Sequence, residues 1–424
     1  MALSESLPTR AATVSLLIDG ADLHGAQASF DELDRLLITA GATPVLRLIQ
    51  QRPTPDVRTY IGKGKVRELA QLCADRDVEL VVFDCELTPS QIRNLENELG
   101  ETVQVIDRSM LILDIFALHA TTGEGKLQVE LAQLKYTVPR LAGRGAELSR
   151  QGGGAIAARG PGETKLETDR RHIHRRMQAL EEELRVMDAH RATQRKMRER
   201  SGIFRFAIAG YTNAGKSTLL NRLTDAGILA EDKLFATLDP TSRKFTLPGG
   251  EEVLLADTVG FIRNLPHHLI RAFRSTLDEV AYADAVLVLV DGSDSENEAQ
   301  LSVTRKLLCE LGCEGKPTMI VYNKCDREAQ TLPTPPEGVE REDCYYVSAL
   351  TGQGLDELAA GMERIVQGGS ALCRLLLPYD RQDMVNRIYG IASVKAVEYR
   401  EDGVYVEAVC DRRARGMLEK WMIV

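Results

Sequence analysis

Over the first 125 residues, short apolar runs alternate with amphipathic segments whose apolar positions recur at helical spacing. The strand-like runs lie at 13–18, 43–50, 79–83 and 103–106, and the helical segments lie at 30–40, 66–75 and 90–99. This alternation predicts an open parallel sheet with helices on its faces. We therefore expect an N-terminal α/β domain at 1–125.

Two apolar stripes at helical spacing come next. The first consists of Leu127, Leu131, Leu134 and Val138, and the second of Leu166, Ile173, Met177, Leu180, Leu184 and Met187. Such stripes predict two helices that pair as an antiparallel hairpin, which we assign to 126–200. The segment between the stripes, 139–163, is rich in Gly and Arg, and we predict a long loop there.

The second half of the chain repeats the alternation of strand-like and helix-like segments. Apolar runs at 204–209, 253–256, 285–290, 318–322 and 345–347 predict the strands of a doubly wound sheet at 201–370. A shorter β-α-β-β pattern then predicts a small α+β domain at 371–424. The expected fold class is α/β multidomain.

Charge is distributed unevenly along this 424-residue chain, whose net charge is −9. Residues 135–200 hold 16 Lys and Arg against 9 Asp and Glu, so this stretch carries +7 and the remainder −16. One basic segment in an acidic protein indicates a localised anionic partner, and we do not expect DNA binding.

The basic segment includes the predicted loop, which contains four arginines. They are Arg140, Arg144, Arg150 and Arg159. Guanidinium groups suit phosphates, and glycines let a backbone approach a shaped surface such as folded RNA. We expect RNA contact here, and the alternative is a linker with incidental charge.

The sequence gives few signs of export or membrane insertion. Its first residues lack the basic-then-apolar pattern of a signal peptide, and no apolar run reaches the length of a membrane span. The eight cysteines are scattered, and no histidine cluster completes a metal site, so we expect reduced thiols. We expect a cytoplasmic monomer, and peripheral membrane association is not indicated.

The stretch after the run 204–209 matches the phosphate-loop pattern G-x-x-x-x-G-K-[ST], and a helix-like segment follows it. Its residues are Gly210, Tyr211, Thr212, Asn213, Ala214, Gly215, Lys216, Ser217 and Thr218. Strand, loop and helix form the setting in which backbone N–H groups wrap phosphates. We predict that Lys216 reaches the β- and γ-phosphates and that the Ser217 hydroxyl binds Mg²⁺.

An N-K-x-D motif follows the run 318–322, and its residues are Asn323, Lys324, Cys325 and Asp326. Guanine presents an N1–H beside its exocyclic amine, so the Asp326 carboxylate can accept two hydrogen bonds. Adenine would leave that carboxylate unpaired. Ser348 and Ala349, behind the next apolar run, suit the loop that contacts guanine O6. The predicted ligand is therefore GTP or GDP.

A D-x-x-G motif lies between these two, with the residues Asp257, Thr258, Val259 and Gly260. We expect Asp257 to act on Mg²⁺ through water and the Gly260 N–H to bind the γ-phosphate. In many GTPases a glutamine follows and orients the attacking water. Here Phe261 follows, so the isolated protein is expected to hydrolyse GTP slowly, until a partner supplies or aligns what is missing.

Asn213 and the first switch each leave two hypotheses. Asparagine at this place resembles GTPases that hold K⁺ beside the phosphates, where the ion acts like an arginine finger. Alternatively, Asn213 only tightens the loop through its side-chain hydrogen bonds. In the first switch, 235–241, Thr237 is the predicted Mg²⁺ ligand that senses the γ-phosphate, and Thr241 is the alternative.

A G-K-G-K stretch, residues 62–65, opens one of the N-terminal helical segments. Its two lysines and the helix start could bind a second phosphate or a nucleic-acid backbone. The rest of a nucleotide motif is missing, so a basic helix start with structural glycines is the favoured interpretation.

Several stretches together resemble the HflX-type GTPases over roughly residues 12 to 370. They are the Gly-rich loop with R-G-P-G-E-T at 159–164, L-E-T-D-R-R at 166–171, the G-K-G-K stretch, L-F-A-T-L-D-P-T at 234–241 and D-T-V-G-F-I at 257–262. The resemblance implies a GTPase that binds the large ribosomal subunit and its rRNA. It also implies that stalled or idle ribosomes are split under stress, with the hairpin loop directed to the peptidyl-transferase region.

The family pattern also implies roles for individual residues. Lys216, Thr237 and Gly260 would act in catalysis, with Mg²⁺ on Ser217 and Thr237. The implied GTP contacts are 210–218, Phe235, Ala236, Thr237, Leu238, Asp239, 257–260, 323–326, Ser348, Ala349 and Leu350. The apolar residue at Phe261 is expected in this family, which fits hydrolysis stimulated by a partner.

Two other functions stay open at this point. One is a ribosome-assembly or RNA-remodelling GTPase that uses nucleotide at the 62–65 helix start. The other is a signalling switch that acts on a protein target, such as a membrane protease.

Overall fold

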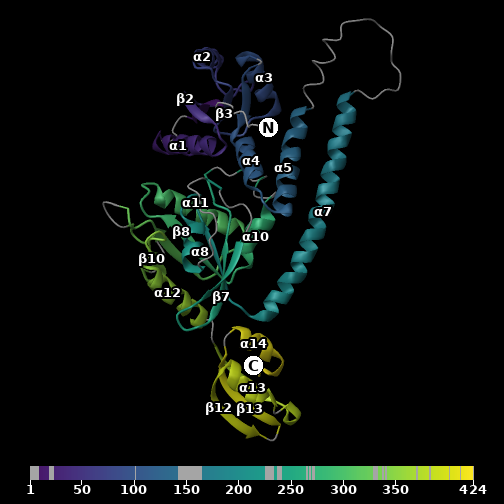
Figure 1. Ribbon diagram of the computed structural model, residues 1–424, viewed down its shortest axis with the longest axis vertical. Helices are drawn as coiled ribbons and strands as arrows, with labels where there is room; N and C mark the ends of the chain where they lie inside the picture. Colours follow the sequence, from purple (N-terminus) through teal and green to yellow (C-terminus); the bar gives the residue numbers. More distant parts are fainter. Residues whose placement is uncertain are drawn as a thin grey trace, which may run out of the picture. The chain divides into compact units, whose positions relative to one another are not determined.

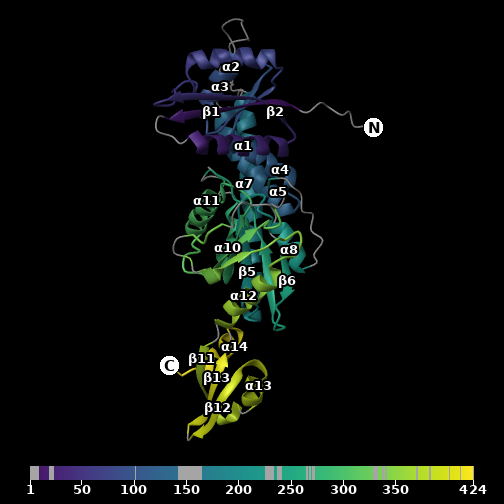
Figure 2. The ribbon, with the colours of Figure 1, turned by 90° about the vertical axis from the view of Figure 1, so that its left-hand side faces the viewer.

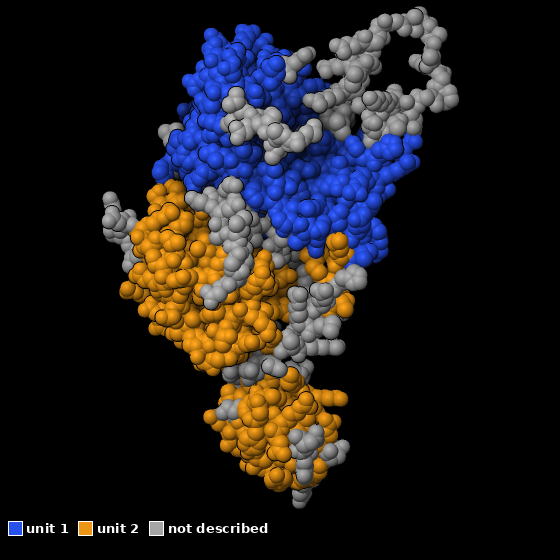
Figure 3. Space-filling model, viewed as in Figure 1, with its two compact units in different colours: residues 1–186, 231–239, 259–276 blue, residues 187–230, 240–258, 277–424 orange. Residues whose placement is uncertain are grey.

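The computed structural model describes most of the chain as two compact units, shown in Figure 3. The described residues are 9–18, 23–100, 102–141, 165–224, 234–235, 241–263, 266, 269, 273–327, 333–336, 339, 341–368, 371–381, 383–400, 402–410 and 412–423. Unit 1 comprises 1–186, 231–239 and 259–276, and unit 2 comprises 187–230, 240–258 and 277–424. The four-domain division at 1–125, 126–200, 201–370 and 371–424 stays a prediction.

Unit 1 is built on a four-stranded parallel sheet in the order β2-β1-β3-β4. Its elements are β1 (Arg10–Ile18), α1 (Leu23–Thr39), β2 (Thr43–Arg52), α2 (Lys63–Asp75), β3 (Leu80–Phe83), α3 (Pro89–Leu99), β4 (Gln104–Asp107), α4 (Arg108–His119) and α5 (Gly123–Leu141). Helix α1 lies on one face of the sheet and α2 and α3 on the other (Figure 2). The predicted open parallel sheet is confirmed.

Local sequence signals fix where two of these helices begin. Thr88 caps α3 with a capping box, since its hydroxyl accepts a hydrogen bond from the Gln91 N–H and the Gln91 side chain accepts one from the Thr88 N–H. Asp107 caps α4 by accepting from the Met110 N–H at 3.0 Å. Both caps follow the carboxyl ends of parallel strands, so they set the direction in which each helix leaves the sheet.

Helix α5 pairs with α7 (Lys165–Ser201), which runs back along it in Figure 1. Arg176 makes a two-pronged ion pair with Glu130 at 2.7 Å for each contact, and Lys135 pairs with Glu181 at 2.8 Å. Leu180 is fully buried, as the predicted stripe on α7 requires. The stripe on α5 is only half-buried apart from Val138. Other positions of α5, Val129 and Ala132, are buried, and this helix packs on α3 and α4.

A buried arginine ties α4 to the rest of unit 1. Arg108 is 2% exposed and pairs with Asp84 at 2.6 Å and with the Glu32 carboxylate, both buried as well. Its guanidinium also donates to the Arg263 carbonyl at 3.1 Å. Asp84 accepts a further hydrogen bond from Ser29 at 2.5 Å. One charged group therefore holds α1, the end of β3, α4 and the segment 259–276 together.

An aromatic cluster also connects α4 with two short segments from the second half of the chain. The Phe116 ring of α4 packs edge-on against Phe235, with centroids 4.8 Å apart, and against Phe273 at 4.5 Å. Phe235 and Phe273 are 3% exposed. Because edge-to-face pairs are favourable beyond their buried area, both short segments from the second half of the chain are held in unit 1 by one side chain.

Unit 2 contains a six-stranded sheet in the order β10-β9-β8-β5-β7-β6, in which all strands are parallel except the edge strand β6, which pairs antiparallel with β7. Its elements are β5 (Arg205–Gly210), α8 (Lys216–Thr224), β6 (Thr241–Thr246), β7 (Glu252–Asp257), α10 (Arg274–Tyr282), β8 (Ala285–Asp291), α11 (Asn297–Glu310), β9 (Thr318–Asn323), β10 (Cys344–Tyr346) and α12 (Leu355–Gly368). The doubly wound sheet is confirmed. Strand β6 was not predicted, because a mostly exposed edge strand carries no apolar run.

The C-terminal part of the chain forms a three-stranded antiparallel sheet in the order β11-β13-β12. Its elements are β11 (Ala371–Leu377), α13 (Asp383–Ile391), β12 (Ser393–Arg400), β13 (Gly403–Cys410) and α14 (Arg412–Leu418). Leu375, Ile388 and Val406 lie in its separate core. The predicted β-α-β-β order is confirmed, and α14 adds to it. Among the described residues, no helix is long and apolar enough to cross a membrane.

Substitution of Arg108 by Ala should destabilise the protein by about 3–5 kcal/mol, since it leaves two buried carboxylates without their cation. The measurement is urea unfolding followed by circular dichroism. The matched control is Arg58→Ala, because Arg58 is 67% exposed and its pair with Glu98 should contribute less than about 1 kcal/mol. Equal losses from the two substitutions would contradict the role given to Arg108.

Candidate nucleotide-binding site

The predicted nucleotide motifs follow the carboxyl ends of the parallel strands of unit 2. The phosphate loop follows β5, Asp257 ends β7, Asn323 ends β9, and Ser348 follows β10. Parallel strands end at one edge of a sheet, and ligands of doubly wound folds bind at that edge. The order of strands therefore brings motifs more than a hundred residues apart into one place.

Two glycines of the phosphate loop are required by space. A side chain at Gly210, whose φ is +156°, would collide with the Leu289 carbonyl oxygen of the neighbouring strand. At Gly215, whose φ is +94°, it would collide with the Asn323 amide. The loop then enters α8 at Lys216, so its backbone N–H groups and the helix N-terminus share one location.

Lys216 lies inside the loop. Its ammonium donates to the Tyr211 carbonyl at 2.8 Å and the Gly210 carbonyl at 3.2 Å. The side chain is 7% exposed, and desolvation lowers its pKa to about 8, against a smaller opposing effect of Asp257. The ammonium is therefore held in place by two backbone carbonyl oxygens, and a phosphate would supply further negative charge beside it.

Oxygen atoms suited to Mg²⁺ meet at the start of α8. The Ser217 hydroxyl donates to Asp257 at 2.7 Å, and Asp257 is fully buried. A hydroxyl and a carboxylate beside the phosphates fit an ion that prefers oxygen ligands and keeps several waters. Among the described residues, no cluster of three His, Cys, Asp or Glu could hold a metal alone, so the phosphates would have to complete the coordination.

Asn323 connects three loops. Its amide donates to the Ala214 carbonyl of the phosphate loop at 2.8 Å and accepts from the Ala349 N–H at 2.9 Å. It is 2% exposed. Since one planar amide makes both bonds, the phosphate loop and the loop after β10 are held at a fixed distance from the N-K-x-D motif.

Asp326 is held in position for the base. The Ser348 hydroxyl donates to its Oδ1 at 2.5 Å and accepts from the Thr351 N–H at 3.1 Å. Asp326 itself is exposed, which leaves its carboxylate accessible to the two N–H groups of guanine. The neighbouring Lys324 pairs with Asp291 at 2.7 Å.

The segments predicted as switches are described only in part. Phe235, Val259, Gly260 and Phe261 are buried, with Phe261 only 1% exposed. Ala236, Thr237, Leu238 and Asp239 lie outside the described residues, as do Arg144, Arg150 and Arg159. Arg140 lies in α5, but its side chain is outside the described part.

Comparison with known proteins covers nearly the whole chain. Four family models match in succession: "GTP-binding GTPase N-terminal" at 27–117, "GTP-binding GTPase Middle Region" at 119–198, "50S ribosome-binding GTPase" at 205–324 and "HflX C-terminal domain" at 337–419. A GTPase HflX from Lacrimispora saccharolytica is 47% identical over 395 residues, which are 93% of this chain and 92% of the relative. The chain belongs to the HflX family of GTPases.

Two further matches are a second relative and a solved structure. The GTPase HflX of Escherichia coli is 39% identical over 88% of this chain and 87% of its own length. A GTP-binding protein of the archaeon Sulfolobus solfataricus, solved in complex with GDP, is 25% identical over 84% of this chain and 98% of that one, with a TM-score of 0.42. As an HflX-family member, the protein is a GTPase that binds GTP and GDP.

Two groups of the G-K-G-K stretch at the start of α2 have partners within the protein. The Gly62 N–H donates to the Gln50 side chain at 2.7 Å, and Lys65 pairs with Glu68 at 2.9 Å. These contacts satisfy part of the helix start without a ligand, so they support the structural interpretation of the two glycines.

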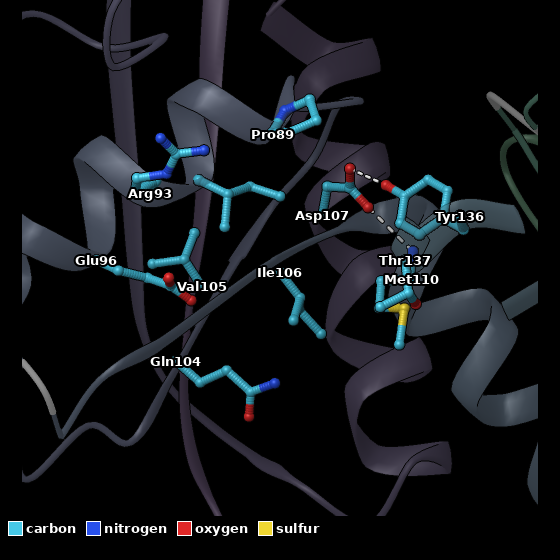
Figure 4. A pocket seen from close by; sticks show the side chains of 11 residues that line it. Pro89, Arg93, Glu96, Gln104, Val105, Ile106, Asp107, Met110, Tyr136 and Thr137 are labelled. Atoms are coloured by element: carbon cyan, nitrogen blue, oxygen red, sulfur yellow. Dashed lines mark hydrogen bonds between the residues drawn. The ribbon is translucent and has the colours of Figure 1, made fainter. Parts of the chain in front are cut away.

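A pocket of about 170 Å³ lies in unit 1 beside β4 (Figure 4). It is lined by β4 and by residues of α3, α4 and α5, and one of its carboxylates, that of Asp107, is already hydrogen-bonded. Tyr136 donates to Asp107, which also accepts from the N–H groups of Leu87 and Met110. Asp107 is therefore occupied in capping α4, and we assign no ligand to the pocket.

The supporting roles of Asp291 and the Ser348 Oγ in the N-K-x-D motif were not predicted. Asp291 directly follows the apolar run 285–290 and is the last residue of β8, and the Ser293 hydroxyl also donates to it at 2.6 Å. A carboxylate directly after a buried parallel strand was the available signal, because that position lies at the same edge as the nucleotide motifs.

Lys216 should add a contribution to the stability of the nucleotide-free protein that grows as the pH rises from about 8 towards 10.5, the ordinary lysine value. Over this range the unfolded chain still binds a proton at Lys216 that the folded protein has lost, so this contribution to the free energy of unfolding increases with pH. It is on the order of 3 kcal/mol. Buried thiols with raised pKa values, such as Cys73 and Cys85, act in the opposite direction above pH 9, so the measured quantity is the difference between the original protein and Lys216→Met in urea unfolding, and the original protein should have the more positive slope against pH. Equal slopes for the two proteins would contradict the lowered pKa.

Substitution of Asp326 by Asn should weaken GDP binding at least about 100-fold, because the exocyclic amine of guanine loses its acceptor. Xanthine carries a carbonyl in place of that amine, so xanthosine diphosphate should bind the variant better than GDP does. Fluorescence titration with labelled nucleotides measures both. The control, Asp343→Asn, changes an exposed carboxylate in the 3₁₀ turn Arg341–Asp343 and should leave both affinities unchanged.

Proposed function

We propose that this HflX-family GTPase binds the large ribosomal subunit in the cytoplasm and dissociates stalled or idle ribosomes under stress. Contact with the ribosome would stimulate hydrolysis of GTP to GDP, and the protein would act as a monomer. The observation that carries the proposal is the basic stretch 135–200 in a chain whose remainder is acidic, combined with the match of 205–324 to ribosome-binding GTPases.

In this proposal the hairpin of α5 and α7 would carry the RNA contact. Its ion pairs and the buried Leu180 hold the two helices together. Arg170 and Arg175 of α7 are exposed, and exposed guanidinium groups bind phosphates without any need for base sequence. The residues between the helices, with Arg144, Arg150 and Arg159, would then make the deeper contact with rRNA.

The nucleotide site supports a switch with a stimulated reaction. Lys216 and the phosphate loop would bind the phosphates, and Asp326 the guanine. Mg²⁺, held by Ser217 and Thr237 with Asp257 acting through water, would neutralise charge on the β- and γ-phosphates. Gly260 would sense the γ-phosphate, and K⁺ at Asn213 would add positive charge. The buried Phe261 offers no hydrogen bond to a water molecule, which agrees with slow hydrolysis before the partner binds.

The deciding measurement is GTP hydrolysis with and without purified large subunits, in K⁺ and in Na⁺ buffer, with intact ribosomes followed by sedimentation. We expect stimulation together with subunit separation. Stimulation without separation would favour a ribosome-assembly or RNA-remodelling GTPase. Absence of stimulation would overturn the proposal and favour a signalling switch with a protein target.

Replacement of Arg140, Arg144, Arg150 and Arg159 by Ala should weaken binding to large subunits and reduce its dependence on salt. If all four contact phosphates, the slope of log K against log salt should fall by about 3. The control replaces Arg58, Arg243, Arg374 and Arg400, four arginines outside 126–200, so the change in net charge is the same. Equal effects of the two sets would show that only overall charge matters.

A further inference from the structure

The tip of the phosphate loop is a tight turn. The Ala214 N–H donates to the Tyr211 carbonyl at 3.3 Å, so Thr212 and Asn213 form the middle of the turn. Asn213 takes a φ of +62° there. Phosphate loops wrap the terminal phosphates of a nucleotide with their backbone, so Thr212 belongs to the part of the loop nearest to the bond that is hydrolysed.

The hydroxyl of Thr212 is buried without a hydrogen bond. Thr212 is 6% exposed, and its Oγ1 has no hydrogen-bond partner within the described part of the chain. Two other hydroxyls of the predicted nucleotide site do have partners, since Ser217 donates to Asp257 and Thr258 donates to the Ile208 carbonyl, each at 2.7 Å. Burial of an unpaired hydroxyl is unfavourable, whereas valine has the same shape and no such group.

The protein lacks a water-orienting side chain directly after its D-x-x-G motif. Hydrolysis of GTP requires that a water molecule be oriented towards the γ-phosphorus, and the glutamine that does so in many GTPases is replaced by Phe261. A glutamine amide offers both a donor and an acceptor. A threonine hydroxyl offers the same pair, because it has one O–H donor and two acceptor lone pairs.

We propose that the Thr212 hydroxyl orients the attacking water in GTP hydrolysis. It would accept a hydrogen bond from the water and donate one to a γ-phosphate oxygen. The water oxygen then bonds to the γ-phosphorus as the bond to the β–γ bridging oxygen breaks, and the bonding electrons leave with GDP. Of the two water protons, one stays on the phosphate and one passes to solvent, and Thr212 keeps its own. The inference rests on the GTPase activity and not on the ribosome.

Because Thr212 is 6% exposed, its hydroxyl becomes accessible only if the residues that cover it move. Segments around the γ-phosphate rearrange when GTP binds in proteins of this class. A hydroxyl that is unpaired without nucleotide destabilises the nucleotide-free protein, and the same hydroxyl stabilises the transition state if it is paired there. This gives the proposal two observable consequences of opposite sign.

The test is Thr212→Val, which replaces the hydroxyl by a methyl group. At saturating GTP, without ribosomes, single-turnover hydrolysis should slow by about 10- to 100-fold, near the low end of the effect of removing one such donor. Affinity for GDP and for a non-hydrolysable GTP analogue should change less than about threefold. The melting temperature of the nucleotide-free protein should rise by about 2 °C or more.

Two variants separate catalysis from structure. Thr212→Ser keeps the hydroxyl and should keep the hydrolysis rate within about threefold of the original protein. Thr258→Val removes a hydroxyl that already has a partner, so its melting temperature should fall. The proposal is overturned if Thr212→Val hydrolyses GTP at the original rate, if it melts at a lower temperature, or if Thr212→Ser is as slow as Thr212→Val.

Discussion

The ion cluster around Arg108 is the constraint on which unit 1 depends. A guanidinium this deeply buried is tolerated only because two buried carboxylates and a backbone carbonyl surround it. Those partners come from α1, from the residue after β3 and from the segment 259–276, which is far away in the sequence. Once Arg108 occupies its position at the start of α4, these elements have little freedom to shift, because any displacement leaves a charge unpaired in the interior.

Unit 2 depends on a different kind of constraint, which is geometric. Five of its six strands are parallel, so their carboxyl ends meet at one edge of the sheet, where the phosphate loop follows β5, Asp257 and Asn323 end β7 and β9, and Ser348 follows β10. Asn323 then fixes the distance between the phosphate loop and the loop after β10, since its amide makes a hydrogen bond to each of them. The base-binding and phosphate-binding halves of the site are therefore positioned relative to each other by one side chain.

Much of this could be predicted because the signals are local. The apolar run at 285–290 became β8, and the phosphate loop lies between β5 and α8 as its pattern requires. Strand β6 escaped prediction because an exposed edge has no apolar period. The predicted face of α5 was only partly right, since the helix packs on two sides and a single stripe cannot show that. The Arg108 cluster and the unpaired Thr212 hydroxyl depend on long-range burial, which no local pattern reports.

The position of Phe116 bears on how the protein can be divided. Its ring covers both Phe235 and Phe273, although these two residues belong by sequence to the region of the nucleotide motifs. A fragment that begins near residue 201 would keep both phenylalanines and lose the ring that shields them. Two aromatic side chains would then meet solvent beside the switch segments, and such surfaces adhere to one another. Self-association and GTP hydrolysis measured on such a fragment would consequently reflect exposed switch segments. In the whole chain the Phe116 ring covers these phenylalanines.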